Sequence, residues 1–236
     1  MISVLQEPVW RTNSPMCSLL LLAVALAILN WLAVARKWKL VEYVSKPAVT
    51  LALVAWLWQT GKMHGPLTWF AVGVALSVAG DVFLMVPRDL FIAGLAAFLL
   101  AHLAYIVGLN PTPPPVSAFT LVATGILVLI VSWAYARLNK GLAARGAAAL
   151  RLPVLVYAIV ISLMVLSALV TLIRPEWHPT HAALVAGGAV LFLISDLTLA
   201  WDRFVAPVSR ADLKVIITYH LAQFGILLGA ALHFRP

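Results

Sequence analysis

Charged residues are scarce in this sequence. Asp, Glu, Lys and Arg make up 10% of the 236 residues, while 64% are hydrophobic and the mean hydropathy is +1.04. Soluble globular domains carry about a quarter charged residues and about half apolar residues. A chain this apolar would expose too much hydrocarbon to water, and it has no polar stretch long enough for a separate aqueous domain. The composition therefore excludes a soluble domain and predicts an integral membrane protein.

Cysteine and clustered metal ligands are also nearly missing. The single cysteine, Cys17, lies in an apolar segment, so no disulfide within the chain is possible. No HExxH or HxxxH pattern occurs, and two isolated histidines inside apolar runs are thin support for a zinc site. We expect no metal and no other cofactor.

What the sequence has instead is a series of apolar runs, each close to the roughly twenty residues that cross a bilayer. They cover residues 16–35, 46–60, 67–86, 90–109, 116–136, 152–173, 181–200 and 213–234. The first run lacks a preceding basic region and a small-residue cleavage site, so it is predicted to be a retained span. We predict an all-α bundle of about eight transmembrane helices, with 16–236 as one domain and 1–15 as a short N-terminal tail.

Basic residues in short loops are retained on the cytoplasmic side of a membrane. Twelve of the sixteen Lys and Arg follow the first, third, fifth and seventh runs: Arg36, Lys37, Lys39, Lys46, Arg88, Arg137, Lys140, Arg145, Arg151, Arg203, Arg210 and Lys214. This asymmetry predicts that both termini lie outside, and the compact loops suit a bacterial inner membrane. It also explains the net charge of +8 without a nucleic-acid partner. The partner is the lipid bilayer, and no pattern indicates an oligomeric state.

Two acidic residues lie inside the runs, Asp81 and Asp196, each after a small residue and four or five residues before the cytoplasmic end. That places them roughly 6 to 8 Å deep at 1.5 Å per residue. Ionisable side chains at membrane depth are costly, so we predict a functional pair of carboxylates at one level. The alternative is that each reaches water or a loop arginine, Arg88 or Arg203, and only closes a helix end.

Further polar side chains lie on the same helical faces or at the same side. His102 and Tyr105 share a face of the fourth run, and Tyr219, His220 and Gln223 cluster on the eighth. They line the same cavity as the carboxylates or form hydrogen bonds between helices. Lys46 and Pro47 are expected to open the second helix, with the Lys46 side chain extending to the lipid headgroups. Alternatively, Lys46 binds a lipid phosphate or pairs with an Asp. Tyr157 and Arg203 complete the candidate site.

A weak internal similarity, here called the echo, relates the two halves of the chain. Three features of the first half, Lys46-Pro47, Asp81 and His102, have counterparts in the same order four helices later: Arg151-Leu152-Pro153, Asp196 and His220. Parallel repeats require this same orientation. The intervals differ, so the pattern indicates either a four-plus-four pseudo-repeat or a coincidence of short motifs.

Four ordered motifs carry a family resemblance. The residues GDVFLM at 80–85, GLAAFLLAHLAY at 94–105, LFLISD at 191–196 and YHLAQ at 219–223 resemble the YhhN-type lysoplasmalogenase family. The resemblance implies an eight-helix hydrolase that cleaves the vinyl ether of lysoplasmalogens, releasing a fatty aldehyde and glycerophosphoethanolamine or glycerophosphocholine. It also implies that Asp81 and Asp196 are catalytic. His220 stands where a second aromatic residue beside Tyr219 is expected.

Vinyl ether hydrolysis begins with protonation of carbon and passes through an oxocarbenium ion that water captures. Two carboxylates in unlike environments can act as the acid and the anion, as in glycosidases, although the sequence does not say which is which. Lys46 or Arg203 would hold the phosphate. Three other classes remain: a transporter or binding protein for a small anionic or lipid solute, a metal-dependent hydrolase and a lipid-sensing scaffold.

Overall fold

A computed structural model describes residues 15–61, 64–86 and 88–235, and every regular element in this part of the chain is a helix. The long helices are α1 (Pro15–Ala35), α2 (Lys39–Gly61), α3 (Pro66–Met85), α4 (Phe91–Leu109), α5 (Ala118–Ala144), α6 (Arg151–Val170), α7 (Pro179–Phe204) and α8 (Ala211–His233). All eight are long and apolar enough to span a membrane. The all-α prediction is confirmed, while residues 1–14 of the predicted tail lie outside the described residues.

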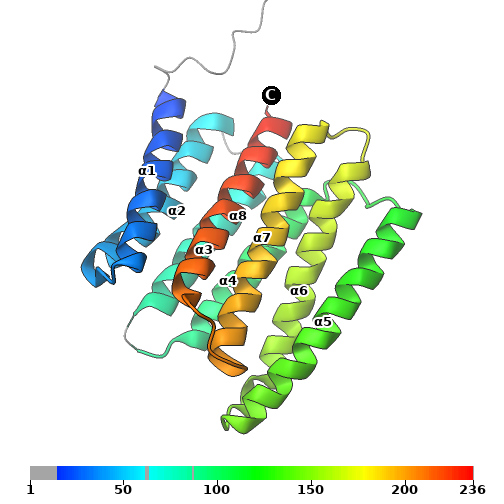
Figure 1. Cartoon of the computed structure of the whole chain (residues 1–236). Coiled ribbons are helices and arrows are strands. Elements are labelled where there is room, and N and C mark those ends of the chain that lie inside the picture. The colour runs from blue at the N-terminus through cyan, green and yellow to red at the C-terminus, as the bar shows by residue number, and fades with distance from the viewer. Residues whose placement is uncertain (1–14, 62–63, 87, 236) are drawn as a thin grey trace, which may run out of the picture.

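The helices form one bundle in which α8 has a central place (Figure 1). It packs against α1, α2, α3 and α7, whereas α1 with α2 and α5 with α6 stand at opposite ends of the bundle. The second half of the chain therefore returns to the first half through α8 and through the packing of α4 on α6. Side chains from distant parts of the sequence meet along these two seams.

Small residues bring α7 and α8 close together. A Cβ atom added to Gly188 would lie 2.7 Å from the backbone nitrogen of Ile226, and one added to Gly225 would lie 2.8 Å from the carbonyl oxygen of Leu184. Near the charged end, Ser195 Oγ donates to the carbonyl oxygen of Val215 at 3.0 Å. In lipid, such close backbone packing replaces the hydrophobic effect as the main force between helices.

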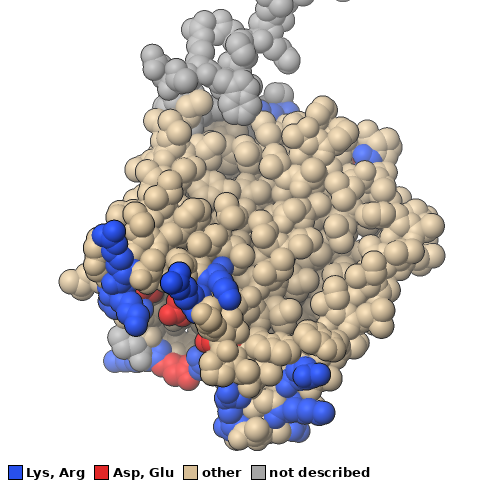
Figure 2. Space-filling view, in the orientation of Figure 1, with Lys and Arg blue, Asp and Glu red and all other residues tan. Residues whose placement is uncertain are grey.

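The outer surface is apolar over most of its height, with large aliphatic side chains such as Leu21 and Leu129 exposed on α1 and α5. Lys and Arg gather at one end of the molecule, where acidic side chains lie among them around a hollow (Figure 2). An apolar surface with charged side chains gathered at one end is what an integral membrane protein requires. The protein is an integral membrane protein.

Two helix boundaries correct the sequence interpretation. Lys46 and Pro47 do not open the second helix, because α2 begins at Lys39 and Pro47 lies inside it. Charged and apolar residues alternate in the first two turns of α2, where Lys39 and Glu42 are paired at 2.9 Å. Similarly, α7 continues to Phe204, past the predicted end of its apolar run, so Asp196 lies eight residues from the end of the helix.

Candidate active site

Asp81 on α3 is buried, with 1% of its side chain exposed. Its Oδ2 accepts hydrogen bonds from Tyr219 OH at 2.8 Å and Thr50 Oγ1 at 3.2 Å, and its Oδ1 faces Lys46 Nζ at 3.2 Å. Lys46 and Thr50 are four residues apart on α2 and therefore present their side chains on one face. The structure thus surrounds this carboxylate with one cation and two hydroxyl donors, which we call the Asp81 cluster.

The Asp81 cluster continues into a chain of buried hydrogen bonds. Gln223 Nε2 donates to the oxygen of Tyr219 at 3.4 Å, and Gln223 Oε1 accepts from Tyr105 OH at 2.7 Å. This chain joins α3, α8 and α4. Each member satisfies its neighbour's polar group away from water, which fixes the orientation of the Tyr219 hydroxyl that bonds to Asp81.

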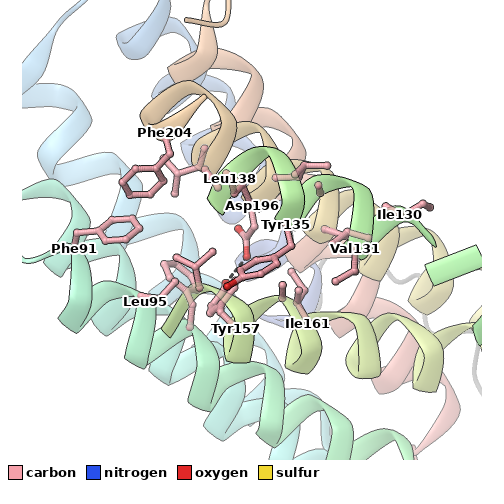
Figure 3. Close-up of a pocket in the computed structure, with 18 of the residues that line it drawn as sticks. Phe91, Leu95, Ile130, Val131, Tyr135, Leu138, Tyr157, Ile161, Asp196 and Phe204 are labelled. Atoms are coloured by element: carbon pink, nitrogen blue, oxygen red, sulfur yellow. Dashed lines mark hydrogen bonds between the residues drawn. The ribbon is translucent and has the colours of Figure 1, made fainter. Parts of the chain in front are cut away.

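Asp196 on α7 has different partners. Its Oδ2 accepts a short hydrogen bond from Tyr157 OH and lies 3.4 Å from His102 Nε2, while His102 Nε2 and Tyr157 OH are 2.9 Å apart. Figure 3 shows Tyr157 and Asp196 pointing toward each other in the lining of a pocket. The Asp196 side chain is 17% exposed. We call these three residues from α4, α6 and α7 the Asp196 cluster.

Aromatic rings stand between the two clusters. The Phe192 ring contacts both the Tyr219 ring, with centroids 5.4 Å apart, and the His102 ring, with centroids 4.7 Å apart. Phe98 packs on the same side, because Gly80 leaves room for it; a Cβ at that position would lie 2.6 Å from the ring. Within the described residues, no hydrogen bond or ion pair joins the two carboxylates directly. The aspartates belong to separate networks that meet at Phe192.

Each cluster adjoins its own pocket. The first, here called the polar pocket, has a volume of about 870 Å³ including its open part and lies at the charged end. Figure 2 shows the mixed blue and red side chains around this hollow. Its charged lining residues come from α2, α7 and α8: Lys39, Glu42, Lys46, Asp202 and Asp212. The Asp81 cluster therefore meets the polar pocket through Lys46.

The second, here called the apolar pocket, lies between α4, α5, α6 and α7 and has a volume of about 810 Å³ including its open part. Aliphatic and aromatic side chains line most of it, as Figure 3 shows for Leu95, Ile130 and Phe204. The carboxyl group of Asp196 and the hydroxyl group of Tyr157 stand out as polar groups in this lining. A hydrocarbon chain would therefore find a carboxyl group at one wall of an apolar space.

Two predicted site residues lie elsewhere. His220 Nδ1 accepts from Trp31 Nε1 at 3.0 Å, so His220 connects α8 to α1. Arg203 Nη2 lies 2.9 Å from both carboxylate oxygens of Asp89. Arg203 therefore pairs with Asp89 and with neither Asp81 nor Asp196, which leaves water or Arg88 as the partners that the alternative interpretation allows.

Sequence reasoning missed two residues of this network, Thr50 and Trp31. Thr50 could have been found, because it lies one turn after Lys46 on the same helical face. Nothing in the sequence position of Trp31 separates it from the other tryptophans near the ends of the apolar runs, where an aromatic belt at the membrane interface is expected. In the described part of the chain, no group of three or more His, Cys, Asp or Glu side chains is close enough to hold a metal ion.

The fold and site define a polytopic membrane protein with one buried and one partly buried carboxylate, Asp81 and Asp196, near a charged pocket and an apolar pocket. A sequence model of the YhhN family matches residues 41–230, and the chain belongs to this family. The resemblance in the four motifs is therefore confirmed.

Curated relatives extend the similarity to most of the chain. Lysoplasmalogenase TMEM86B of Mus musculus is 33% identical over 89% of this chain and 84% of its own length. The Rattus norvegicus protein of the same name is 32% identical over 76% and 69%, and lysoplasmalogenase of Mycobacterium bovis is 31% identical over 79% and 67%. No solved structure matches this chain.

Proposed function

We propose that this protein hydrolyses the vinyl ether bond of lysoplasmalogens to a fatty aldehyde and glycerophosphoethanolamine or glycerophosphocholine. Relatives that cover most of the chain are named lysoplasmalogenase. The observation that carries the proposal is the unlike surroundings of the two aspartates. Asp81 lies 3.2 Å from the ammonium group of Lys46, whereas Asp196 is bonded to Tyr157 and His102 at the wall of an apolar pocket.

These surroundings support a division of roles. In this mechanism Asp196 is the acid: its Oδ2 is bonded to Tyr157 and His102, and its Oδ1 delivers the proton to the vinyl carbon distant from the ether oxygen. The positive charge that develops on the carbon next to the ether oxygen is stabilised by Asp81, whose Oδ1 lies 3.2 Å from Lys46 Nζ. General acid catalysis of this kind contributes about a hundredfold to ten-thousandfold in rate.

The rest of the reaction follows from the same groups. Water adds to the cationic carbon and gives up a proton to the carboxylate that Asp196 has become, which restores the acid. The resulting hemiacetal gives its hydroxyl proton to the glycerol oxygen as the bond between the carbon and that oxygen breaks, which releases an aldehyde and an alcohol. The hydrogen-bonded network of Tyr105, Gln223 and Tyr219 fixes the orientation of the Tyr219 hydroxyl that donates to Asp81. His220 positions α8 through Trp31.

The proposal includes a place in the cell. The side of the basic loops is assigned to the cytoplasm, which puts both chain termini outside and both aspartates nearer the cytoplasmic end of a bacterial inner membrane. The gathering of Lys and Arg at one end of the molecule supports this orientation. A lysophospholipid and the bilayer are the partners, and residues 16–236 act as one membrane domain.

The first experiment measures aldehyde release from lysoplasmenyl-ethanolamine by detergent-purified protein. Asp81→Asn and Asp196→Asn are expected to lower the rate at least about a hundredfold, the smallest effect typical of general acid–base groups. Glu176→Gln is the matched control, because Glu176 is half exposed and pairs with Arg174 at 3.5 Å outside both clusters.

Each variant is compared after it elutes as folded, monodisperse material. Unchanged aldehyde release from both Asn variants would contradict the carboxylate mechanism. No aldehyde from the wild type, with lipid still bound, would favour the transporter or binding protein predicted as the alternative.

A further inference from the structure

The polar and apolar pockets share two lining residues. Leu84 on α3 and Leu199 on α7 line both of them. A charged hollow and an apolar space therefore adjoin at these two aliphatic side chains. Such a boundary fits a ligand whose polar and apolar parts are joined by a short linker.

The apolar pocket continues away from this boundary. A third space, of about 740 Å³ including its open part, lies between α5 and α6 and shares Val131 and Tyr135 with the apolar pocket. Its outer lining includes Val128, Ile159 and Leu163, which are 57%, 47% and 49% exposed on the apolar surface of the bundle. We call this third space the α5–α6 groove. The apolar pocket and the α5–α6 groove together form an apolar route from Asp196 to the lipid-facing surface.

The charges of the polar pocket are mixed. Lys39 pairs with Glu42 at 2.9 Å, Lys46 faces Asp81, and Asp202 Oδ1 accepts from the backbone nitrogen of Val208 at 2.7 Å. For Asp212 no hydrogen bond or ion pair is found in the described part of the chain, although it lines this pocket. Two ammonium groups and three carboxylates in one hollow complement a zwitterion better than a purely anionic group.

We propose, on the basis of the function proposed above, that one zwitterionic single-chain phospholipid binds across the Leu84–Leu199 boundary. Its phosphate meets Lys46 and Lys39, its ammonium group meets Asp212 and Asp202, and its hydrocarbon chain fills the apolar pocket and the α5–α6 groove. The bond between glycerol and chain then lies at the boundary between the Asp81 and Asp196 clusters. The fatty aldehyde leaves through the groove into the bilayer, while the water-soluble headgroup product leaves from the polar pocket.

The headgroup part is tested by binding of alkyl ether analogues that cannot be hydrolysed. Hexadecyl lysophosphoethanolamine is compared with the hexadecyl glycerol phosphate that lacks the amine. Asp212→Asn is expected to weaken binding of the ethanolamine analogue about tenfold, or about 1.4 kcal/mol, and to leave the phosphate analogue unchanged. Glu176→Gln, an acid-to-amide change near Arg174, controls for the loss of one negative charge.

The chain part is tested by closing the groove. Val131→Trp, at the junction of the apolar pocket and the α5–α6 groove, is expected to weaken binding of the hexadecyl analogue about tenfold and to spare the octyl analogue. Val128→Trp, which lines only the groove, is the second variant and has the same selectivity for the longer chain. Leu129→Trp is the control, because Leu129 is 72% exposed and lines none of these pockets.

Binding and hydrolysis separate the two proposals. If neither the amine nor the chain length affects binding in any of these variants, the two-pocket arrangement is wrong, even when the wild type releases aldehyde. If the analogues bind with the expected selectivity and no aldehyde is released, the arrangement stands and the proposed hydrolase activity is wrong.

Discussion

The two aspartates occupy corresponding positions in the two halves of the bundle but have different partners. Asp81 on α3 is bonded from the preceding helix α2 and from α8, and Asp196 on α7 is bonded from the preceding helix α6 and from α4. When each helix is replaced by the one four positions away, α3 with its partners α2 and α8 becomes α7 with its partners α6 and α4. This is the pattern expected of the four-plus-four pseudo-repeat, which stays a prediction.

The difference lies in the charge of the partners. Asp81 is 1% exposed and faces the ammonium group of Lys46, whereas Asp196 is 17% exposed and meets a tyrosine and a histidine. Arg151, the counterpart of Lys46 in the echo, is exposed at the start of α6, where its carbonyl accepts from Tyr135. Similar helix geometry thus provides one carboxylate with a buried cation and the other with uncharged donors. In the proposed mechanism, the partners of the two aspartates, and not the residue type, divide the chemical roles.

The largest expected effect comes from removing that cation. Lys46→Met leaves Asp81 buried without its counter-charge, which costs about 3 to 5 kcal/mol in buried ion pairs. We expect a lower midpoint of unfolding in detergent, measured by a thermal or denaturant scan, and recovery in the double variant Lys46→Met, Asp81→Asn.

Lys39→Met is the matched control for that scan. Lys39 is 61% exposed and pairs with Glu42 at the start of the same helix, where such pairs contribute about 1 kcal/mol or less. Equal destabilisation by the two lysine variants would remove the contrast between a buried and an exposed ion pair on α2.

A smaller effect is expected from the tyrosines that bond to the aspartates. Tyr157→Phe removes the hydroxyl donor of Asp196, which stabilises the carboxylate that forms as Asp196 gives up its proton. The variant should lower aldehyde release about tenfold, since a hydrogen bond to a charged group contributes about 1.5 kcal/mol. Tyr219→Phe should lower it less, because Asp81 keeps Thr50 and Lys46. Initial rates at saturating substrate measure both, and a larger loss in Tyr219→Phe would reverse the assignment of the acid.

The smallest expected effect concerns Thr50. Thr50→Val keeps the shape of the side chain and removes one of the donors to Asp81, which should cost about 1 kcal/mol of unfolding free energy. Thr60→Val on the same helix is the control, since the Thr60 hydroxyl donates to the carbonyl of Trp56 within α2. The two variants are compared by denaturant unfolding, and identical values would mean that the Thr50 bond adds nothing to the Asp81 cluster.

Errors in the sequence interpretation came from reading hydropathy along short windows. The polar first turns of α2 and the charged last turn of α7 are helical but not apolar, so the predicted spans stopped short of Lys39 and Phe204. As a result Lys46 was placed at a helix start. In the structure, His102 Nε2 on α4 lies 3.4 Å from Asp196 Oδ2 on α7.

The sequence by itself determined that the chain lies in lipid, where its helices are, and which two aspartates lie within them. Hydropathy and the cost of an intramembrane charge are properties of a short stretch of chain. Only the tertiary structure decided the partners: Lys46 with Asp81, His102 and Tyr157 with Asp196, and Trp31 with His220. Those contacts join helices up to 189 residues apart and depend on how each helix is rotated and how closely small residues let it approach. No local pattern in the chain encodes those rotations.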